Sequence, residues 1–156
     1  MDIEHTTRRE QPTACATAHL TVDEIGPWIS ATYQAVMRTV AEQGSSLAGP
    51  PYGRYHQLDD GLLAVEAGFP VVTPITASGD VHPSALPGGP VATTIHIGPY
   101  DKVEPAYRAL AEWIGEHSGE PAGDAWENYF SDPVTQPDPG TWRTEIVQPY
   151  RDWTER

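Results

Sequence analysis

One carboxylate stands among aromatic side chains in residues 126–130, whose sequence is Trp-Glu-Asn-Tyr-Phe. The segment is predicted to be a β-strand, in which successive side chains point to opposite faces. Glu127 would then share a face with Tyr129, while Trp126 and Phe130 lie on the other face. Because both faces carry aromatic rings, we expect the strand to be covered on both sides and the acid to be buried. A buried carboxylate without a partner is costly in free energy or takes up a proton.

Such a group is suited to recognising a lipophilic cation. Aromatic faces attract cations, and each cation–π contact contributes roughly 0.5–2 kcal/mol. At low dielectric the charge pair adds more, provided that the ligand supplies the counter-ion. The alternative interpretation is that Glu127 hydrogen-bonds to core tyrosines or faces solvent.

Other catalytic or metal-binding patterns are not found in the sequence. It contains no GxSxG, Walker A, GxGxxG or HExxH motif, and the six histidines (5, 19, 56, 82, 96 and 117) show no metal-ligand spacing. The single cysteine, Cys15, excludes an internal disulfide and a CxxC zinc site, and it is expected to be a small buried hydrophobe. We therefore expect neither a metal nor a cofactor. His56, close to Tyr52, is the histidine that could line a pocket.

The excess of acidic residues restricts the classes of molecule that the chain can bind. Nine Lys and Arg against 22 Asp and Glu give a net charge of −13 in 156 residues. Such a chain repels the phosphate backbone and lacks the basic patches that bind anionic membranes, so we expect no direct nucleic-acid or membrane binding. The polar N-terminus and the lack of an apolar run of about 18 residues predict a soluble, cytoplasmic protein. An acidic surface does favour cationic small molecules and basic protein partners.

Two weak internal similarities suggest a duplication. Residues 16–20 resemble residues 93–97, 77 positions further on, and residues 48–55 resemble residues 122–129, 74 positions further on. Each copy has the predicted order strand, helix, strand, strand. The first pair aligns His19 with His96, so we interpret both histidines as structural strand residues.

The predicted elements give an α+β domain over residues 13–150. Apolar stripes and capping signals predict helices over residues 23–43 and 102–117, the second with Asp101 as its cap. Strands are predicted over residues 52–57, 62–72, 125–131 and 142–148, with an Asp-Gly hairpin turn at Asp60-Gly61. The predicted division is an N-terminal tail (1–12), repeat one (13–72), a Pro- and Gly-rich connector (73–90), repeat two (91–150) and a C-terminal tail (151–156).

A set of short segments is informative when taken together. These segments are Gly98-Pro99-Tyr100, Glu116 with Pro121-Ala122-Gly123, Trp126-Glu127-Asn128-Tyr129 with Asp132-Pro133, Trp142-Arg143-Thr144-Glu145-Ile146, and Val65-Glu66-Ala67-Gly68-Phe69-Pro70-Val71. Through them the chain resembles the GyrI-like small-molecule-binding domain, a family also called the effector-binding domain of AraC- and MerR-type drug-responsive regulators. The match covers about residues 13–150, nearly the whole chain.

The resemblance implies a pseudo-twofold duplication of a β-α-β-β (SHS2-like) module, with antiparallel sheets and two main helices around a shared pocket. It also implies that Glu127 is the acid that holds cationic, aromatic ligands. The aromatic lining that we expect around it consists of Tyr55, Tyr129, Trp126, Phe69 and Tyr100, although strand alternation places Trp126 on the face opposite Glu127.

Three functions remain open at this point. The first is a stand-alone binding protein for lipophilic, aromatic, often cationic small molecules, which would sequester them or report them to a partner. The second is a hydrolase of cyclopropane-bearing DNA-alkylating natural products, an activity of some stand-alone members of the family, with Glu127 as the catalytic acid or base. The third is an acidic protein-interaction module, like family members that antagonise DNA gyrase or its toxins.

Overall fold

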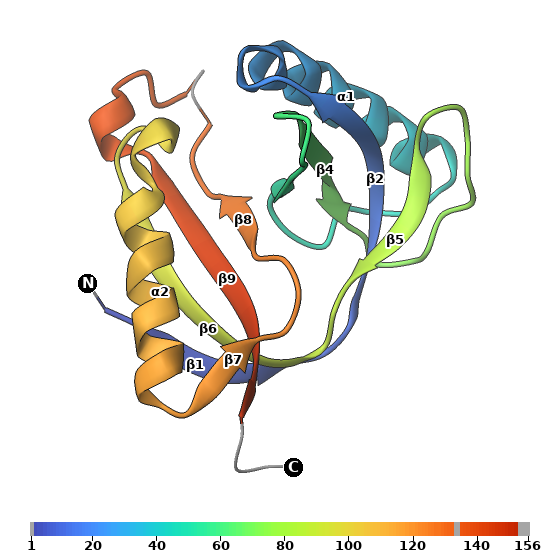
Figure 1. Cartoon of the computed structure of the whole chain (residues 1–156). Coiled ribbons are helices and arrows are strands. Elements are labelled where there is room, and N and C mark those ends of the chain that lie inside the picture. The colour runs from blue at the N-terminus through green and yellow to red at the C-terminus, as the bar shows by residue number, and fades with distance from the viewer. Residues whose placement is uncertain (1, 133–134, 153–156) are drawn as a thin grey trace. The chain divides into compact units, whose positions relative to one another are not determined.

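The computed structural model describes residues 2–132 and 135–152, which fold into two compact units (Figure 1). The N-unit is Glu10–Pro87, and the C-unit combines Met1–Arg9 with Gly88–Arg156. Each unit pairs antiparallel strands with one main helix, so the predicted α+β class is confirmed. Within the described residues, no helix is long and apolar enough to cross a membrane.

The N-unit has the order strand, helix, strand, strand, followed by an edge strand. Its helix covers the sheet face that carries Ala14 and Phe69, and Val36 and Val40 of the helix belong to the same core cluster. The strands pair in the order β3-β4-β2-β5. The elements are β2 (Gln11–Leu20), α1 (Val22–Glu42), β3 (Tyr52–Gln57), β4 (Leu63–Pro70) and β5 (His82–Leu86).

The C-unit repeats this order with two additional strands. Its helix packs on β6 and β9 (Figure 1), where Leu110 and Ile114 meet Ala92 and Ile146. The strands pair in the order β1-β6-β9-β8, and β7 also pairs with β9. The elements are β1 (Glu4–Arg8), β6 (Gly89–Ile97), a 3₁₀ turn η1 (Tyr100–Lys102), α2 (Glu104–Glu116), β7 (Gly119–Pro121), β8 (Trp126–Tyr129), a 3₁₀ turn η2 (Pro139–Thr141) and β9 (Arg143–Asp152).

The predicted N-terminal tail and the predicted connector each contain an edge strand. Part of the predicted N-terminal tail forms β1, which pairs with β6 from Glu4 opposite Thr93 to Arg8 opposite Gly89. The connector contributes β5, which pairs with β2 alone and carries Pro83. A proline is tolerated there because an edge strand has backbone groups that need no partner. Residues 153–156 of the predicted C-terminal tail lie outside the described residues.

The second helix begins differently from the prediction. The cap expected at Asp101 is wrong, because residues 100–102 form the turn η1 and α2 starts at Glu104 after Val103. Pro105 occupies the first turn of α2, where its missing N–H has no intrahelical partner to lose. The first helix begins with the predicted capping box, in which the Glu24 carboxylate accepts from the Thr21 backbone N–H at 2.8 Å.

Strand pairing inside each unit defines which positions of the two repeats correspond. In the N-unit, Ala67 lies opposite both Ala16 and Gly53. In the C-unit, Ile146 lies opposite both Thr94 and Glu127. Because Ala67 and Ile146 both face the helix of their own unit, Gly53 corresponds to Glu127, as the offset of 74 predicts.

The other predicted offset, 77, is wrong by one residue. The row Ala18, Val65, Tyr55 in the N-unit corresponds to the row His96, Thr144, Tyr129 in the C-unit. Ala18 is therefore the counterpart of His96. A shift of one residue in a strand moves a side chain to the other face of the sheet. As a result His96 is buried on the face covered by α2, whereas His19 is exposed.

Candidate functional site

Glu127 lies in the middle of β8 and points toward α2. Its strand partner Ile146 belongs to the core cluster under that helix, and paired residues of neighbouring strands share a face. The side chain is 6% exposed, so the expected burial of the acid is confirmed. Trp126 precedes it on the opposite face and is 2% exposed, in agreement with the predicted alternation.

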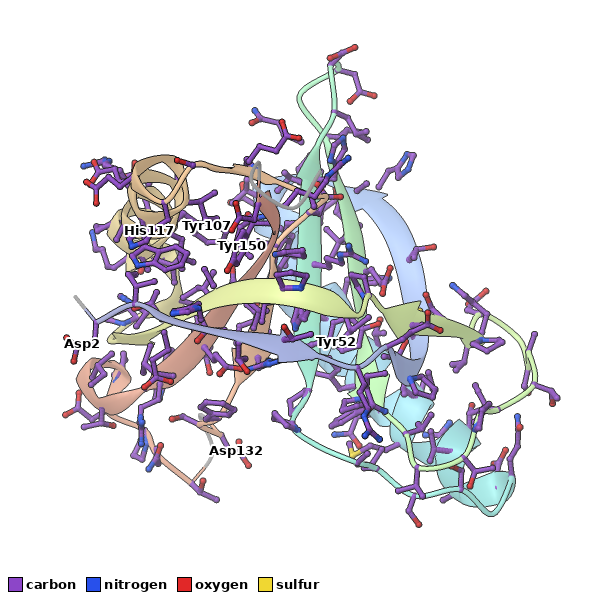
Figure 2. The ribbon with its side chains drawn as sticks, turned by 90° about the horizontal axis from the view of Figure 1, so that it is seen from below. Asp2, Tyr52, Tyr107, His117, Asp132 and Tyr150 are labelled. Carbon is purple, nitrogen blue, oxygen red and sulfur yellow. The ribbon has the colours of Figure 1, made fainter. Side chains whose placement is uncertain are left out.

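Two phenol hydroxyls hold the carboxylate, one on each oxygen. The Tyr107 hydroxyl donates to Oε2 of Glu127 at 2.5 Å, and the Tyr129 hydroxyl donates to Oε1 at 3.1 Å. Tyr107 comes from α2 (Figure 2), whereas Tyr129 lies two residues along β8 from Glu127, on the same face. In the part of the chain that the structure describes, no Lys or Arg forms an ion pair with Glu127.

Burial dominates the electrostatics of the acid. Loss of solvation raises the pKa of the Glu127 carboxyl above its ordinary value. The hydrogen bonds from Tyr107 and Tyr129, followed by the charge of His96, act in the opposite direction and offset part of this rise in pKa. The site therefore combines a carboxylate that is costly to ionise with donors that accommodate its charge.

His96 also has a structural role, as the sequence predicts. Its Nε2 lies 2.9 Å from the carbonyl oxygen of Pro99. Because a carbonyl can only accept, Nε2 carries the proton and donates. This bond fixes the turn that leads from β6 into η1, and the imidazole is 9% exposed.

Further aromatic rings extend the cluster away from the acid. The rings of Tyr129 and Tyr100 lie 5.2 Å apart, and Tyr100 stacks on Trp142 with a centroid distance of 4.6 Å. The Tyr100 hydroxyl donates to the carbonyl oxygen of Ser131 at 3.1 Å. Burial, with the charge of Asp132 as a second cause, raises the pKa of Tyr100. We call Glu127, Tyr107, Tyr129, Tyr100 and Trp142 the acid–aromatic cluster.

The remaining predicted ligand-binding residues lie in the N-unit. Tyr55 is half-buried on β3 opposite Val65, on the face that α1 covers. Phe69 is 6% exposed in the core of that unit, with its ring 5.4 Å from that of Tyr33. Their contribution to a ligand site stays a prediction.

Sequence reasoning missed Tyr107 and Trp142 as site residues. Tyr107 falls on the apolar stripe of the second helix, and its ring does pack against the core. The sequence feature that could have identified Tyr107 as a site residue is its hydroxyl group, since a buried tyrosine hydroxyl needs a hydrogen-bond partner. Trp142 directly follows η2 and stacks on Tyr100. Its indole Nε1 donates to the carbonyl oxygen of Gln136 at 2.6 Å, a contact within the loop.

Other reactive side chains are placed outside this cluster. Cys15 is fully buried in β2, and burial together with the charge of Glu66 raises the pKa of its thiol to about 12. This thiol is a core group, as predicted, and not a nucleophile. His56 is exposed on β3. Among the described residues, no cluster of three or more His, Cys, Asp or Glu could hold a metal ion.

Comparison with known proteins identifies the relatives of the chain. Residues 1–151 match the family model described as the GyrI-like small molecule binding domain. A search of curated proteins finds no match.

Solved structures share the fold. EcmrR in a complex with DNA is 22% identical, with a TM-score of 0.80 over 97% of this chain, which spans 57% of that protein chain. The separate EcmrR C-terminal domain is 21% identical, with a TM-score of 0.81 over 97% of this chain and 98% of the domain. A hydrolase from Listeria innocua is 13% identical, with a TM-score of 0.69 over 96% of this chain and 92% of its own. SAV2435 bound to tetraphenylphosphonium is 12% identical, with a TM-score of 0.62 over 100% of this chain and 98% of its own.

Proposed function

The chain belongs to the GyrI-like small-molecule-binding family, and we propose that its acid–aromatic cluster binds lipophilic, aromatic cations. The observation that carries this proposal is that, among the described residues, no Lys or Arg forms an ion pair with Glu127. The carboxylate is 6% exposed, and its hydrogen bonds come from phenols rather than from a basic side chain. A cationic ligand would supply the ion-pair partner that no Lys or Arg in the described part of the chain provides.

The raised pKa of Glu127 gives the site selectivity for charge. Burial makes the ionised form of Glu127 more costly, and an uncharged ligand does nothing to offset that cost. A cation favours the ionised form and gains the attraction of a charge pair at low dielectric. The rings of Tyr129, Tyr100 and Trp142 provide flat apolar surface with a negative face, which suits a delocalised aromatic cation.

A fold relative is consistent with this ligand class. SAV2435 was solved with tetraphenylphosphonium, a cation that carries four phenyl rings. Among the functions that the sequence leaves open, this one uses the whole acid–aromatic cluster.

The experiment compares two matched carboxylate substitutions. Glu127→Gln keeps the shape of the side chain but removes its charge and replaces one acceptor oxygen by an amide donor. Glu66→Gln makes the same change at another acid that accepts from a tyrosine, since Tyr52 donates to Glu66 at 2.6 Å in the N-unit. We expect Glu127→Gln to weaken binding of tetraphenylphosphonium or a rhodamine by about tenfold or more, which corresponds to about 1.4 kcal/mol, and Glu66→Gln to leave it unchanged. Equal affinity of the wild type and Glu127→Gln would contradict the proposal.

A second candidate function is hydrolysis at the same acid. A carboxyl whose pKa is raised by burial is suited to general acid–base chemistry, and the phenol hydroxyls of Tyr107 and Tyr129 lie beside it as potential donors to a substrate carbonyl. A fold relative from Listeria innocua is described as a hydrolase. The test is incubation with a cyclopropane-bearing DNA-alkylating compound, followed by mass spectrometry. Hydrolysis adds one water to the compound, whereas recovery of intact compound in wild type would contradict turnover of that substrate.

A further inference from the structure

Thr144 of β9 carries a buried hydroxyl that the fold does not use. The residue is 0% exposed, and among the described residues its Oγ1 has no hydrogen-bond partner. Nearly all buried polar side-chain atoms in proteins are hydrogen-bonded, and a buried donor or acceptor that lacks a partner costs free energy. The hydroxyl therefore needs an explanation other than stability.

Strand register places Thr144 next to Glu127. Thr144 lies directly opposite Tyr129 of β8, and Ile146, two residues further along β9, lies directly opposite Glu127. Since residues two apart in a strand share a face, Thr144 and Ile146 both lie on the face that α2 covers. Thr144 and Glu127 are thus diagonal neighbours on paired strands, a spacing that long side chains span. Glu127 is 6% exposed and Thr144 is 0% exposed, so the hydroxyl is the deeper of the two groups.

The N-unit shows that this position does not require a polar side chain. Thr144 corresponds to Val65, which is 1% exposed and has the shape of a threonine with a methyl group in place of the hydroxyl. Glu127 corresponds in the same way to Gly53, which has no side chain. The acid and the unpartnered hydroxyl therefore occur together in the C-unit, and the same arrangement of strands folds without either of them in the N-unit.

The polar groups beside Thr144 form other hydrogen bonds. The Tyr129 hydroxyl donates to Oε1 of Glu127, and Nε2 of His96, which lies opposite Thr144 on β6, donates to the carbonyl oxygen of Pro99. Each oxygen of an ionised carboxylate has a further lone pair, so Glu127 can accept from a ligand while its phenols stay bound. A threonine hydroxyl also accepts. The two side chains together are suited to a group that carries more than one N–H.

We propose that Thr144 is a ligand-binding residue of the same site and that it selects aromatic cations that carry amino groups. One N–H of the amino group donates to Glu127, and the other donates to Oγ1 of Thr144. A fully alkylated cation can still pair with the charge of Glu127, but it leaves the Thr144 hydroxyl without a partner. This inference rests on the proposed function, because it concerns the ligand of the acid–aromatic cluster.

The test compares proflavine with acridine orange. Both dyes are acridinium cations at pH 7.5 with the same ring frame, but the amino groups of proflavine are dimethylated in acridine orange. Affinities are measured by fluorescence titration of the whole chain. We expect Thr144→Val, which installs the residue found at Val65, to weaken proflavine binding by about fivefold through the loss of one hydrogen bond. Acridine orange binding is expected to stay the same.

Thr94→Val is the matched control on the same face of the sheet. Thr94 lies opposite Ile146 and is also buried, but its hydroxyl donates to the carbonyl oxygen of Asp2 at 2.8 Å. We expect Thr94→Val to lower the urea midpoint and to leave both dye affinities unchanged. Thr144→Val should keep or raise the midpoint, because it removes no bond within the fold. A clear drop in the midpoint of Thr144→Val would show a structural partner such as a buried water and would overturn the proposal.

Glu127→Gln separates this inference from the proposed function, since it is expected to weaken the binding of both dyes. If it does so, and Thr144→Val changes the two affinities by the same factor or changes neither, the selection of amino groups by Thr144 is wrong while the cation site stands. If neither dye binds the wild type, or if Glu127→Gln weakens neither dye, the proposed function fails and this inference fails with it.

Discussion

In each unit an acid is hydrogen-bonded to a tyrosine, but the tyrosine is the buried residue in the N-unit and the acid is the buried residue in the C-unit. In the N-unit, Tyr52 is fully buried and donates to Glu66 at 2.6 Å, and Glu66 itself is half-buried. Burial, with the charge of Glu66 as a second cause, raises the pKa of the Tyr52 hydroxyl. In the C-unit, Glu127 is the buried partner and its tyrosines are half-buried, so the pKa of the acid is raised instead.

The difference separates a structural hydrogen bond from a site that can respond to a ligand. A buried phenol whose pKa is raised stays neutral, so the Tyr52 hydroxyl remains a hydrogen-bond donor. Burial raises the pKa of the Glu127 carboxyl, and the cation that we propose as ligand would favour its ionised form. The corresponding N-unit position, Gly53, has no side chain, so only the C-unit carries an acid at this point of the repeat.

The largest expected change in stability comes from a substitution in β4, the strand that pairs with β3 next to Gly53. Gly68 lies opposite Cys15 and Tyr52, and its C-unit counterpart Val147 lies opposite Thr93 and Trp126. A Cβ at Gly68 would lie 2.0 Å from the carbonyl oxygen of Ala14, which is backbone and cannot move aside cheaply. We therefore expect Gly68→Ala to lower the free energy of unfolding by about 3 kcal/mol or more, as measured by urea denaturation.

The matched change in the C-unit is Val147→Ala, which removes buried methyl groups rather than adding an atom. We expect it to cost about 2 kcal/mol. A Gly68→Ala variant that loses less than Val147→Ala would show that the N-unit strands are not as closely apposed as described.

The next effect distinguishes the two phenols on Glu127. Tyr107→Phe removes the shorter hydrogen bond and is expected to cost about 2 kcal/mol, whereas Tyr129→Phe removes the longer one at a half-buried position and is expected to cost about 1 kcal/mol. Both bonds lower the pKa of Glu127, so either variant should raise that pKa further. Denaturation midpoints and a carboxyl titration by NMR check both parts. A larger effect of Tyr129→Phe would assign the main donor role to Tyr129.

The pH dependence of stability follows from the raised pKa of Glu127. In the unfolded chain the carboxyl titrates near 4.5, and in the folded chain it titrates at higher pH. Its contribution to stability is therefore complete below pH 4.5 and is lost as the pH rises through the folded pKa, by about 1.4 kcal/mol for each unit of difference. Since Glu127→Gln does not titrate, its stability relative to the wild type should increase from pH 4.5 upward. A stability difference that is constant with pH would contradict the raised pKa.

The smallest effect tests the corrected alignment of the repeats. His96→Ala removes the bond to the Pro99 carbonyl from a buried position, and we expect a loss of about 1 kcal/mol. His19→Ala changes an exposed side chain and should stay within about 0.5 kcal/mol. Similar losses for both histidines would favour the original offset, which treats them as equivalent.

The elements with a clear hydrophobic period could be predicted from the sequence. Both helices and the hairpin between β3 and β4 lie close to their expected positions. Strand β1 could not be predicted, because Glu4–Arg8 is polar and lies at a sheet edge, so burial leaves no alternating pattern. The repeat offset was missed for a related reason: Thr13, Ala14, Cys15 and Ala16 are all buried, and a strand covered on both faces carries no signal for its register.

The candidate site was predictable only within its own strand. Alternation along residues 126–129 was sufficient to place Glu127 and Tyr129 together. Tyr107 meets the acid through the packing of α2 on the sheet, and Trp142 meets Tyr100 through the path of a loop, and neither contact leaves a local pattern.

The most direct test of the account is the titration of the Glu127 carboxyl itself, followed by carbon-detected NMR with and without tetraphenylphosphonium. The account predicts a pKa above 4.5 in the free protein and a clear downward shift when the cation is bound, because the ligand favours the ionised carboxylate. A pKa at or below 4.5 in the free protein, or a value that the bound cation leaves unchanged, would contradict it.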